Sequence, residues 1–254
     1  MADYFHFAPR RRPAVLLSLV GVLLSIAMSA CQAPRSQRLD STEFKPPPGA
    51  TRYALDPESS RIWLQLHADG ALARLGHTHV IVAQQLRGTV WLHPQLERSA
   101  LELVIPVNVL LVDDPHERAA AGGGFAEPID AEARAGTREH MLGESQLDAA
   151  HYPSLTLRSL HIRAADAAAI AGAGAGAGAG RTAVIEFQVS LREHTAQLSV
   201  PVHWQLQGEQ LRASGAVEFK QSDLGIEPYS ALLGALRVAD TVAARFEILA
   251  QRVH

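Results

Sequence analysis

The sequence predicts an all-β protein in which about eight strands form an antiparallel barrel. Segments with alternating apolar and polar residues recur from about residue 53 to the C-terminus, and this period of two is typical of strands that bury one face. Turn signals such as Gln207-Gly208-Glu209 join long segments near the C-terminus, as in an antiparallel meander. One-faced strands in this number pair as a sandwich or close into a barrel, and the meander favours the barrel.

The individual strands follow from this alternation. In the segment that begins at Arg61, Ile62, Leu64 and Leu66 share one face, and Trp63 is an apolar exception on the other. The expected strands, in chain order, cover residues 62–66, 80–82, 86–92, 100–107, 154–163, 182–192, 198–204, 211–219 and 242–248.

Two segments interrupt the strands. In residues 119–143, the glycine run 122–124 predicts a flexible loop, and the composition of residues 130–142 predicts a short helix that ends at Gly143. Residues 164–181 are rich in alanine and glycine, which is compatible with a silk-like repeat or with a flexible hairpin tip. Because so short a run without bulky residues buries little surface, we expect a disordered insertion without a function of its own.

The N-terminus has the organisation of a secretory signal. Three arginines at positions 10–12 precede an apolar run over residues 14–27, and Met28-Ser29-Ala30-Cys31 follows. This end resembles the lipobox of bacterial lipoproteins, so we expect a signal peptide over residues 1–30 and lipid attachment at Cys31. The alternatives are an ordinary signal peptide, or an uncleaved anchor helix with an incidental cysteine. The apolar run is shorter than the ~20 residues that a spanning helix needs.

The residues after Cys31 predict how the domain is attached. Residues 31–51 are polar and end in Pro46-Pro47-Pro48-Gly49, so we expect a flexible tether before a domain over residues 52–254. Gln32 stands where an aspartate would signal retention in the inner membrane. By resemblance to Gram-negative lipoproteins, this favours a periplasmic protein anchored to the outer membrane.

Composition excludes several classes of function. The formal net charge of -3 and the isoelectric point near 6.5 provide no basic field for nucleic acid. Cys31 is the only cysteine, so a domain whose cysteine carries lipid has no thiol for a disulfide, a redox pair or a zinc–thiolate site.

Several motifs resemble the YceI-like family of secreted lipid-binding proteins. The resemblance covers about residues 53–249, and its most specific part is Arg138-Glu139-His140-Met141-Leu142 followed by Leu147-Asp148 and Tyr152-Pro153. The other matching segments are Tyr53-Ala54-Leu55-Asp56 with Ser60, Leu86-Arg87-Gly88-Thr89-Val90, residues 219–226 and residues 238–242. The resemblance implies a lipocalin-like barrel whose members hold polyisoprenoid or other long apolar chains in the lumen.

The residue pattern agrees with an apolar lumen. Aromatic residues are only 6% of the chain, and inward candidates such as Ala213, Gly215 and Ala244 are small, which leaves volume for an acyl or prenyl chain. The alternative is a lumen plugged by Trp63, Trp91, Trp204, Phe187, Phe219 and Phe246. Alternation assigns ten residues to the lumen wall: Leu64, Leu66, Phe187, Val189, Val200, Val202, Val217, Phe219, Ala244 and Phe246.

The twelve histidines raise a second hypothesis. If His77 and His79 lie on a strand, they point to one face, with the spacing that lets two imidazoles bind one metal. His140 or His116 are candidates for a third ligand of a zinc or copper site, and Asp113, Asp114 or Glu139 for a carboxylate. In the other interpretation, which we prefer, Arg74, His77, His79 and His140 gather at the barrel mouth and bind a polar head group such as a phosphate.

No motif supports catalysis. Ser154, Ser159 and Ser222 lack a nucleophile-elbow context, and phosphate-loop and dinucleotide fingerprints are absent from the sequence. Asp113 and Asp114 lie on a predicted loop, and we interpret them as solvated or turn residues. The sequence therefore predicts a non-enzymatic protein, anchored to a membrane, that binds an apolar lipid-like molecule without an obligatory cofactor.

Overall fold

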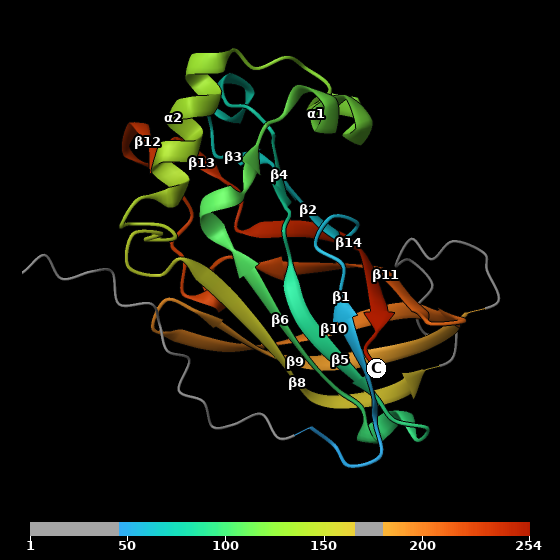
Figure 1. Ribbon diagram of the computed structural model, residues 1–254. Coiled ribbons are helices and arrows are strands. Elements are labelled where there is room, and N and C mark those ends of the chain that lie inside the picture. Colours follow the sequence, from blue (N-terminus) through green and yellow to red (C-terminus); the bar gives the residue numbers. More distant parts are fainter. Residues whose placement is uncertain (1–45, 166–179) are drawn as a thin grey trace, which may run out of the picture. The chain divides into compact units, whose positions relative to one another are not determined.

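The computed structural model describes residues 46–165 and 180–254 (Figure 1). The predicted signal peptide, Cys31, most of the tether and residues 166–179 of the predicted insertion lie outside the described residues. At the tether's end, the Ala50 N–H donates to the Pro47 carbonyl over 3.2 Å, so the proline run ends in a turn directly before the first strand.

Eight antiparallel strands close into a barrel, which confirms the predicted fold class. The sheet order is β1-β5-β6-β8-β9-β10-β11-β14, and pairing of β1 with β14 closes it. The alternation in the sequence produces this closure because each strand turns one apolar face to a common centre. The strands are β1 (Thr51–Leu55), β5 (Arg87–Leu92), β6 (Ala100–Pro106), β8 (Ser154–Ala165), β9 (Arg181–Leu191), β10 (His194–Gln207), β11 (Gln210–Lys220) and β14 (Thr241–Arg252).

A second set of strands extends the barrel wall at one end. The N-terminal half of β14 pairs with β2 (Arg61–Leu66), which pairs with β4 (His79–Ala83) and then with β7 (Leu111–Val112). A separate small sheet contains β12 (Ser230–Ala231), β13 (Leu236–Val238) and β3 (Ala68–Asp69). This small sheet and both α-helices lie at the same end of the barrel, at the top of Figure 1.

The sequence predicted one of the two α-helices and missed the other. Helix α2 (Ala131–Leu142) is the predicted helix, capped by the Asp130 carboxylate, which accepts from the Ala133 N–H over 2.8 Å. Helix α1 (Pro115–Ala121) was not predicted, and the glycine run after it forms a 3₁₀ turn, η4 (Gly123–Phe125). In the part of the chain that the structure describes, no helix has the length and apolar character needed to cross a membrane.

The exceptional position of Trp63 has a structural reason. Val80 and Val82 are each 1% exposed and pack with Trp63 and Phe125 on the outer face of β2 and β4. The Trp63 Nε1–H donates to Glu117 of α1 over 2.7 Å, and the Arg245 guanidinium lies 3.9 Å from the centre of its ring. Because α1 and η4 cover this part of the outer face, β2 carries one apolar residue, Trp63, on the face that it otherwise fills with Arg61 and Gln65.

Candidate ligand-binding cavity

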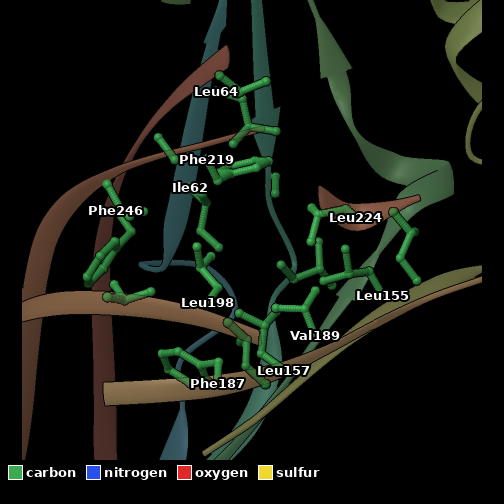
Figure 2. Close-up of a pocket in the computed structure, with 18 of the residues that line it drawn as sticks. Ile62, Leu64, Leu155, Leu157, Phe187, Val189, Leu198, Phe219, Leu224 and Phe246 are labelled. Carbon is green, nitrogen blue, oxygen red and sulfur yellow. The ribbon is translucent and has the colours of Figure 1, made fainter. Parts of the chain in front are cut away.

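The barrel encloses an apolar cavity of about 300 Å³. Figure 2 shows leucine, isoleucine, valine and phenylalanine side chains from β2, β8, β9, β10, β11 and β14 directed toward this common space. The volume is at the low end of the range that proteins use for small-molecule sites. Its wall consists almost entirely of hydrocarbon, so water inside gains few hydrogen bonds and an apolar occupant is favoured.

All ten residues that alternation assigned to the lumen wall line the cavity: Leu64, Leu66, Phe187, Val189, Val200, Val202, Val217, Phe219, Ala244 and Phe246. That they bind a ligand remains a prediction. The sequence assignment omitted further lining residues, among them Leu55, Ile62, Ile81, Leu101, Leu103, Ile105, Val107, Leu110, Met141, Leu155, Leu157, Leu198, Leu224, Ile226 and Ile248. The same period of two in β6 and β8 was a signal that could have found several of these.

The small residues of the wall do not all contribute space. Ala213 and Ala244 line the cavity, as the sequence suggested. A Cβ atom on Gly215 would lie 2.7 Å from Cζ of Phe246 and 2.4 Å from the Pro201 carbonyl oxygen. The Phe246 ring therefore fills the space that a side chain at position 215 would occupy. Gly215 allows this close packing and adds no volume to the cavity.

One end of the barrel is filled with side chains. Tyr53, Trp204, Leu211 and Ala250 are all at most 9% exposed and belong to one hydrophobic cluster there. Among the aromatic residues considered as a plug, Phe187, Phe219 and Phe246 form cavity wall, and the three tryptophans are not lining residues. Phe187, Phe219 and Phe246 therefore line the space, Trp204 belongs to the filled end, and Trp63 lies on the outer face of the wall, so these rings do not plug the lumen.

The opposite end carries polar groups. Gln146 and Gln221 line the cavity, and their amide nitrogens donate to the carbonyls of Glu227 and Ala239 over 3.0 Å and 2.9 Å. Met141 of α2 and Ile226 complete this end of the lining. We refer to this end, beneath α2 and beside the small sheet, as the mouth.

A buried ionic network braces the wall beside the mouth. Asp113 is 0% exposed, and its carboxylate accepts from His79 Nδ1 over 2.7 Å and from the Arg118 guanidinium over 2.8 Å. It also accepts from the Val80 N–H over 2.9 Å. Arg118 is itself 3% exposed and donates further to the carbonyls of Thr78 and Glu127. Burial raises the pKa of Asp113, but the hydrogen bonds from His79, Val80 and Arg118 outweigh it and hold that pKa below its ordinary value.

The network corrects the interpretation of Asp113 as a solvated residue. Asp113 is one of the most buried polar side chains of the described chain. Asp114 is the N-cap of α1, and its carboxylate accepts from the backbone N–H groups of His116 and Glu117. The sequence Asp-Pro-His-Glu has an N-cap residue, proline at the first helical position and glutamate at the third, and this signal could have predicted α1.

The four residues expected at the mouth occupy different local environments. Arg74 and His77 are exposed in the connection between β3 and β4, and His77 precedes the start of β4. His79 is held by Asp113, and its partner across the strands is Leu66, a lining residue. The His140 ring stacks on Tyr229 with 5.2 Å between the ring centroids. No hydrogen bond or ring contact joins any two of the four in the described chain.

The metal hypothesis receives no support from the geometry. Because His77 lies outside the strand, the i, i+2 argument that placed it on one face with His79 does not apply. Among residues 46–165 and 180–254, no group of three histidine, cysteine, aspartate or glutamate side chains is arranged to hold a metal ion.

Comparison with known proteins identifies the family. The family model of the YceI-like domain matches residues 53–250. The crystal structure of BcnA from Burkholderia cenocepacia is similar with a TM-score of 0.52 and 14% identity, covering 77% of this chain and 98% of BcnA. A polyisoprenoid binding domain from Saccharophagus degradans, implicated in plant cell wall breakdown, gives 0.50 and 15%, covering 79% of this chain and 98% of that domain. No curated protein matches the sequence. The chain belongs to the YceI-like family.

Proposed function

We propose that this protein binds one apolar chain, of the isoprenoid or acyl class, in the barrel lumen. The observation that carries the proposal is the cavity of about 300 Å³, whose wall is aliphatic and phenylalanine side chains from consecutive strands. Such a wall favours a hydrocarbon over any polar molecule, because each buried methylene contributes ~0.8 kcal/mol. A structural relative from Saccharophagus degradans is described as a polyisoprenoid binding domain, which supports the isoprenoid class.

We also propose that the domain works in the periplasm, held at the outer membrane by a lipid on Cys31. The order of basic residues, apolar run and Met28-Ser29-Ala30-Cys31 supports this anchoring. Mass spectrometry of the protein from its own envelope tests it directly. A chain that begins at an acylated Cys31 is expected, and a chain that retains residues 1–30 would contradict the proposal.

The primary test of ligand binding is native mass spectrometry of the protein purified from its own envelope. We expect one copy of an apolar chain per protein, released on denaturation and identified by its mass. A lumen that carries no lipid, combined with stoichiometric zinc or copper that a His77→Ala/His79→Ala variant loses, would favour the metal hypothesis instead.

Two neighbouring alanines provide a matched pair of variants. Ala244 lines the cavity, whereas Ala243 is the preceding residue on β14 and is not a lining residue. Ala244→Phe places a ring in the lumen and is expected to displace the bound chain, while Ala243→Phe adds the same ring outside and leaves binding intact. Equal binding by both variants would show that the chain does not occupy the lumen.

We propose that Arg74, His77, His79 and His140 bind the polar head group of this ligand at the mouth. The exposed side chains of Arg74 and His77 suit an anionic group, because both can donate hydrogen bonds to phosphate oxygens. His77→Ala is then expected to weaken binding of a phosphate-headed isoprenoid and to leave binding of a neutral isoprenoid unchanged. An equal loss for both ligands would reject this role.

A further inference from the structure

The most exposed apolar side chains of the described chain gather in two loops at the mouth. Leu75 lies in η1 (Ala73–Leu75), and Leu232 and Leu233 lie in η7 (Leu232–Gly234). They expose 60%, 62% and 108% of their reference areas, and no other large hydrophobic residue in the described chain is as exposed. Single exposed leucines are ordinary, but three that lie together form a feature that needs an explanation.

The two loops are held against each other. The Leu72 N–H donates to the Ala235 carbonyl over 2.8 Å, which joins the η1 segment to the η7 segment. Gly70, with a φ of +94°, lies so close that a Cβ atom there would be 2.6 Å from the same carbonyl oxygen. The loops that carry the three leucines are therefore joined through their backbones, and we call Leu75, Leu232 and Leu233 together the leucine tip.

The backbone holds the leucines of η7 outward. Leu232 and Leu233 have φ angles of +52° and +57°, in the left-handed region that branched, bulky side chains seldom occupy. A strained conformation persists only where the surrounding structure enforces it. In this conformation two large apolar side chains stay in solvent, the opposite of what the burial of apolar surface favours.

The charge around the leucine tip suits a lipid surface. Residues 229–236 contain no charged residue, and Tyr229 at their start is 43% exposed. Arg74, next to Leu75, has no ion pair with any residue that the structure describes, whereas Arg237 behind the tip is paired with Asp69 over 2.8 Å. Leucine for the acyl region, with tyrosine and arginine at the level of the head groups, is the combination that interfacial segments present.

The leucine tip adjoins the cavity mouth. Leu66, the last residue of β2, lines the cavity, and β3 of the small sheet begins two residues later. Ile226 also lines the cavity and lies three residues before Tyr229, which stacks on His140 of α2. A ligand that leaves a bilayer at the leucine tip therefore has apolar surface available directly beside the lumen.

We infer that the leucine tip inserts into a phospholipid bilayer, so that the barrel collects its apolar ligand directly from the membrane. The inference rests on the proposed binding function and adds the source of the ligand. A protein partner fits less well, because stable interfaces bury roughly 800 Å² on each side and a pointed tip of three leucines offers no such area.

The sequence between Cys31 and β1 is long enough to reach past the length of the barrel. When extended it can span at most about 65 Å, whereas a 12-residue strand such as β14 is ~40 Å long. An anchor at Cys31 therefore allows the mouth to face the membrane.

Depth-resolved tryptophan quenching tests the inference. The full chain, purified from its own envelope, is reconstituted in phosphatidylcholine–phosphatidylglycerol vesicles that contain dibrominated lipid. Leu233→Trp places a reporter in the leucine tip, and Leu206→Trp is the matched control, because Leu206 is 45% exposed on β10 near the filled end of the barrel. After subtraction of the parent emission, we expect blue-shifted and quenched emission for Leu233→Trp alone. Emission typical of water from Leu233→Trp, or equal quenching of both, overturns the inference, as does a blue shift that depends on protein concentration without vesicles.

A second measurement separates this inference from the proposed function. In a Leu232→Ser/Leu233→Ser variant, uptake of an isoprenoid from vesicles is expected to slow about tenfold or more, because two leucines no longer contribute to membrane insertion. Binding of the same isoprenoid from detergent solution is expected to stay unchanged, and Leu206→Ser is the control. Unchanged uptake overturns the inference alone, whereas a parent chain that binds no isoprenoid from detergent contradicts the proposed function.

Discussion

Helices α1 and α2 lie at the same end of the barrel, yet they are held there in different ways (Figure 1). The shorter helix, α1, has 7 residues and buries Arg118, whose guanidinium bonds Asp113 and two backbone carbonyls. The longer helix, α2, has 12 residues and buries none of them. It contacts other elements through an exposed hydrogen bond from Arg138 to the Asn108 carbonyl and through the half-buried Met141, which packs against the cavity wall.

The comparison shows that the length of a helix does not determine how firmly it is attached. Helix α1 fixes the edge of the β4–β7 extension through a charge that cannot leave its partner without an uncompensated buried ion. Helix α2 places Met141 on the cavity wall and otherwise lies on the surface. We therefore assign α1 to the permanent wall and α2 to the part of the mouth that opens at lower free energy.

Removal of the buried carboxylate is expected to have the largest effect on this arrangement. Asp113→Ala leaves Arg118, 3% exposed, without its counter-ion, and breaking a buried pair in this way destabilises proteins by ~3–5 kcal/mol. We expect a loss of that size in the free energy of unfolding, measured by urea denaturation.

An exposed ion pair provides the control for Asp113→Ala. Asp69 and Arg237 are joined over 2.8 Å, but their side chains are 47% and 53% exposed. Asp69→Ala is expected to leave stability almost unchanged, because exposed pairs contribute little. Similar losses for both variants would show that Asp113 does not support the wall in the way we describe.

Hydrogen exchange measures the difference between the two helices directly. Opening of α1 must break the Asp113–Arg118 contact, whereas opening of α2 releases no buried side chain. We expect the backbone amides of α2 to exchange at least about tenfold faster than the hydrogen-bonded amides of α1, which corresponds to ~1.4 kcal/mol. Equal protection of the two helices would remove the distinction between wall and mouth.

The pH dependence of stability gives a smaller effect with a defined sign. The pKa of Asp113 is lowered from 3.8 on folding, so the folded state holds its proton less tightly than the unfolded state. The stabilisation is fully present above about pH 5 and is lost as the pH falls through the folded pKa. The difference in unfolding free energy between the parent and Asp113→Asn is therefore expected to shrink as the pH falls from about 5 to below about 4. A difference in unfolding free energy that grows on acidification would contradict a lowered pKa of Asp113 in the folded state.

Local patterns were sufficient to predict the barrel and the positions of its lumen residues. Period-two alternation assigned Phe187 and Val189 of β9 to the cavity because a strand of a closed barrel has one interior face. The helix α2 was predicted from the helical composition of residues 130–142 and its end at Gly143, and Gly143 ends it in an extended conformation with a ψ of 166°.

The network at the mouth could not be predicted in this way. Asp113 is buried because α1 and β4 supply its partners, and these partners are not visible from the residues beside it in the sequence. Alternation failed at Trp63 for a related reason, because it assumes that only one face of a strand is covered. The barrel strands and their lumen residues could be predicted because they follow from the alternation within each strand. The Asp113 network and the position of Trp63 could not, because they depend on contacts between segments that are distant in the sequence.

The smallest expected effect concerns the middle of α2. Gly136 is half-buried within the helix, and a Cβ atom there would have no neighbour within 4 Å. Because glycine weakens a helix interior relative to alanine, Gly136→Ala is expected to stabilise α2 locally by ~0.5–1 kcal/mol. The expected readout is slower exchange of the α2 amides with unchanged exchange in α1. Since α2 covers the lumen, the same variant should also take up and release an apolar ligand more slowly without a change in ligand class. Faster exchange in α2, or an equal change in α1, would mean that the two helices open as one unit and that α2 is part of the fixed wall.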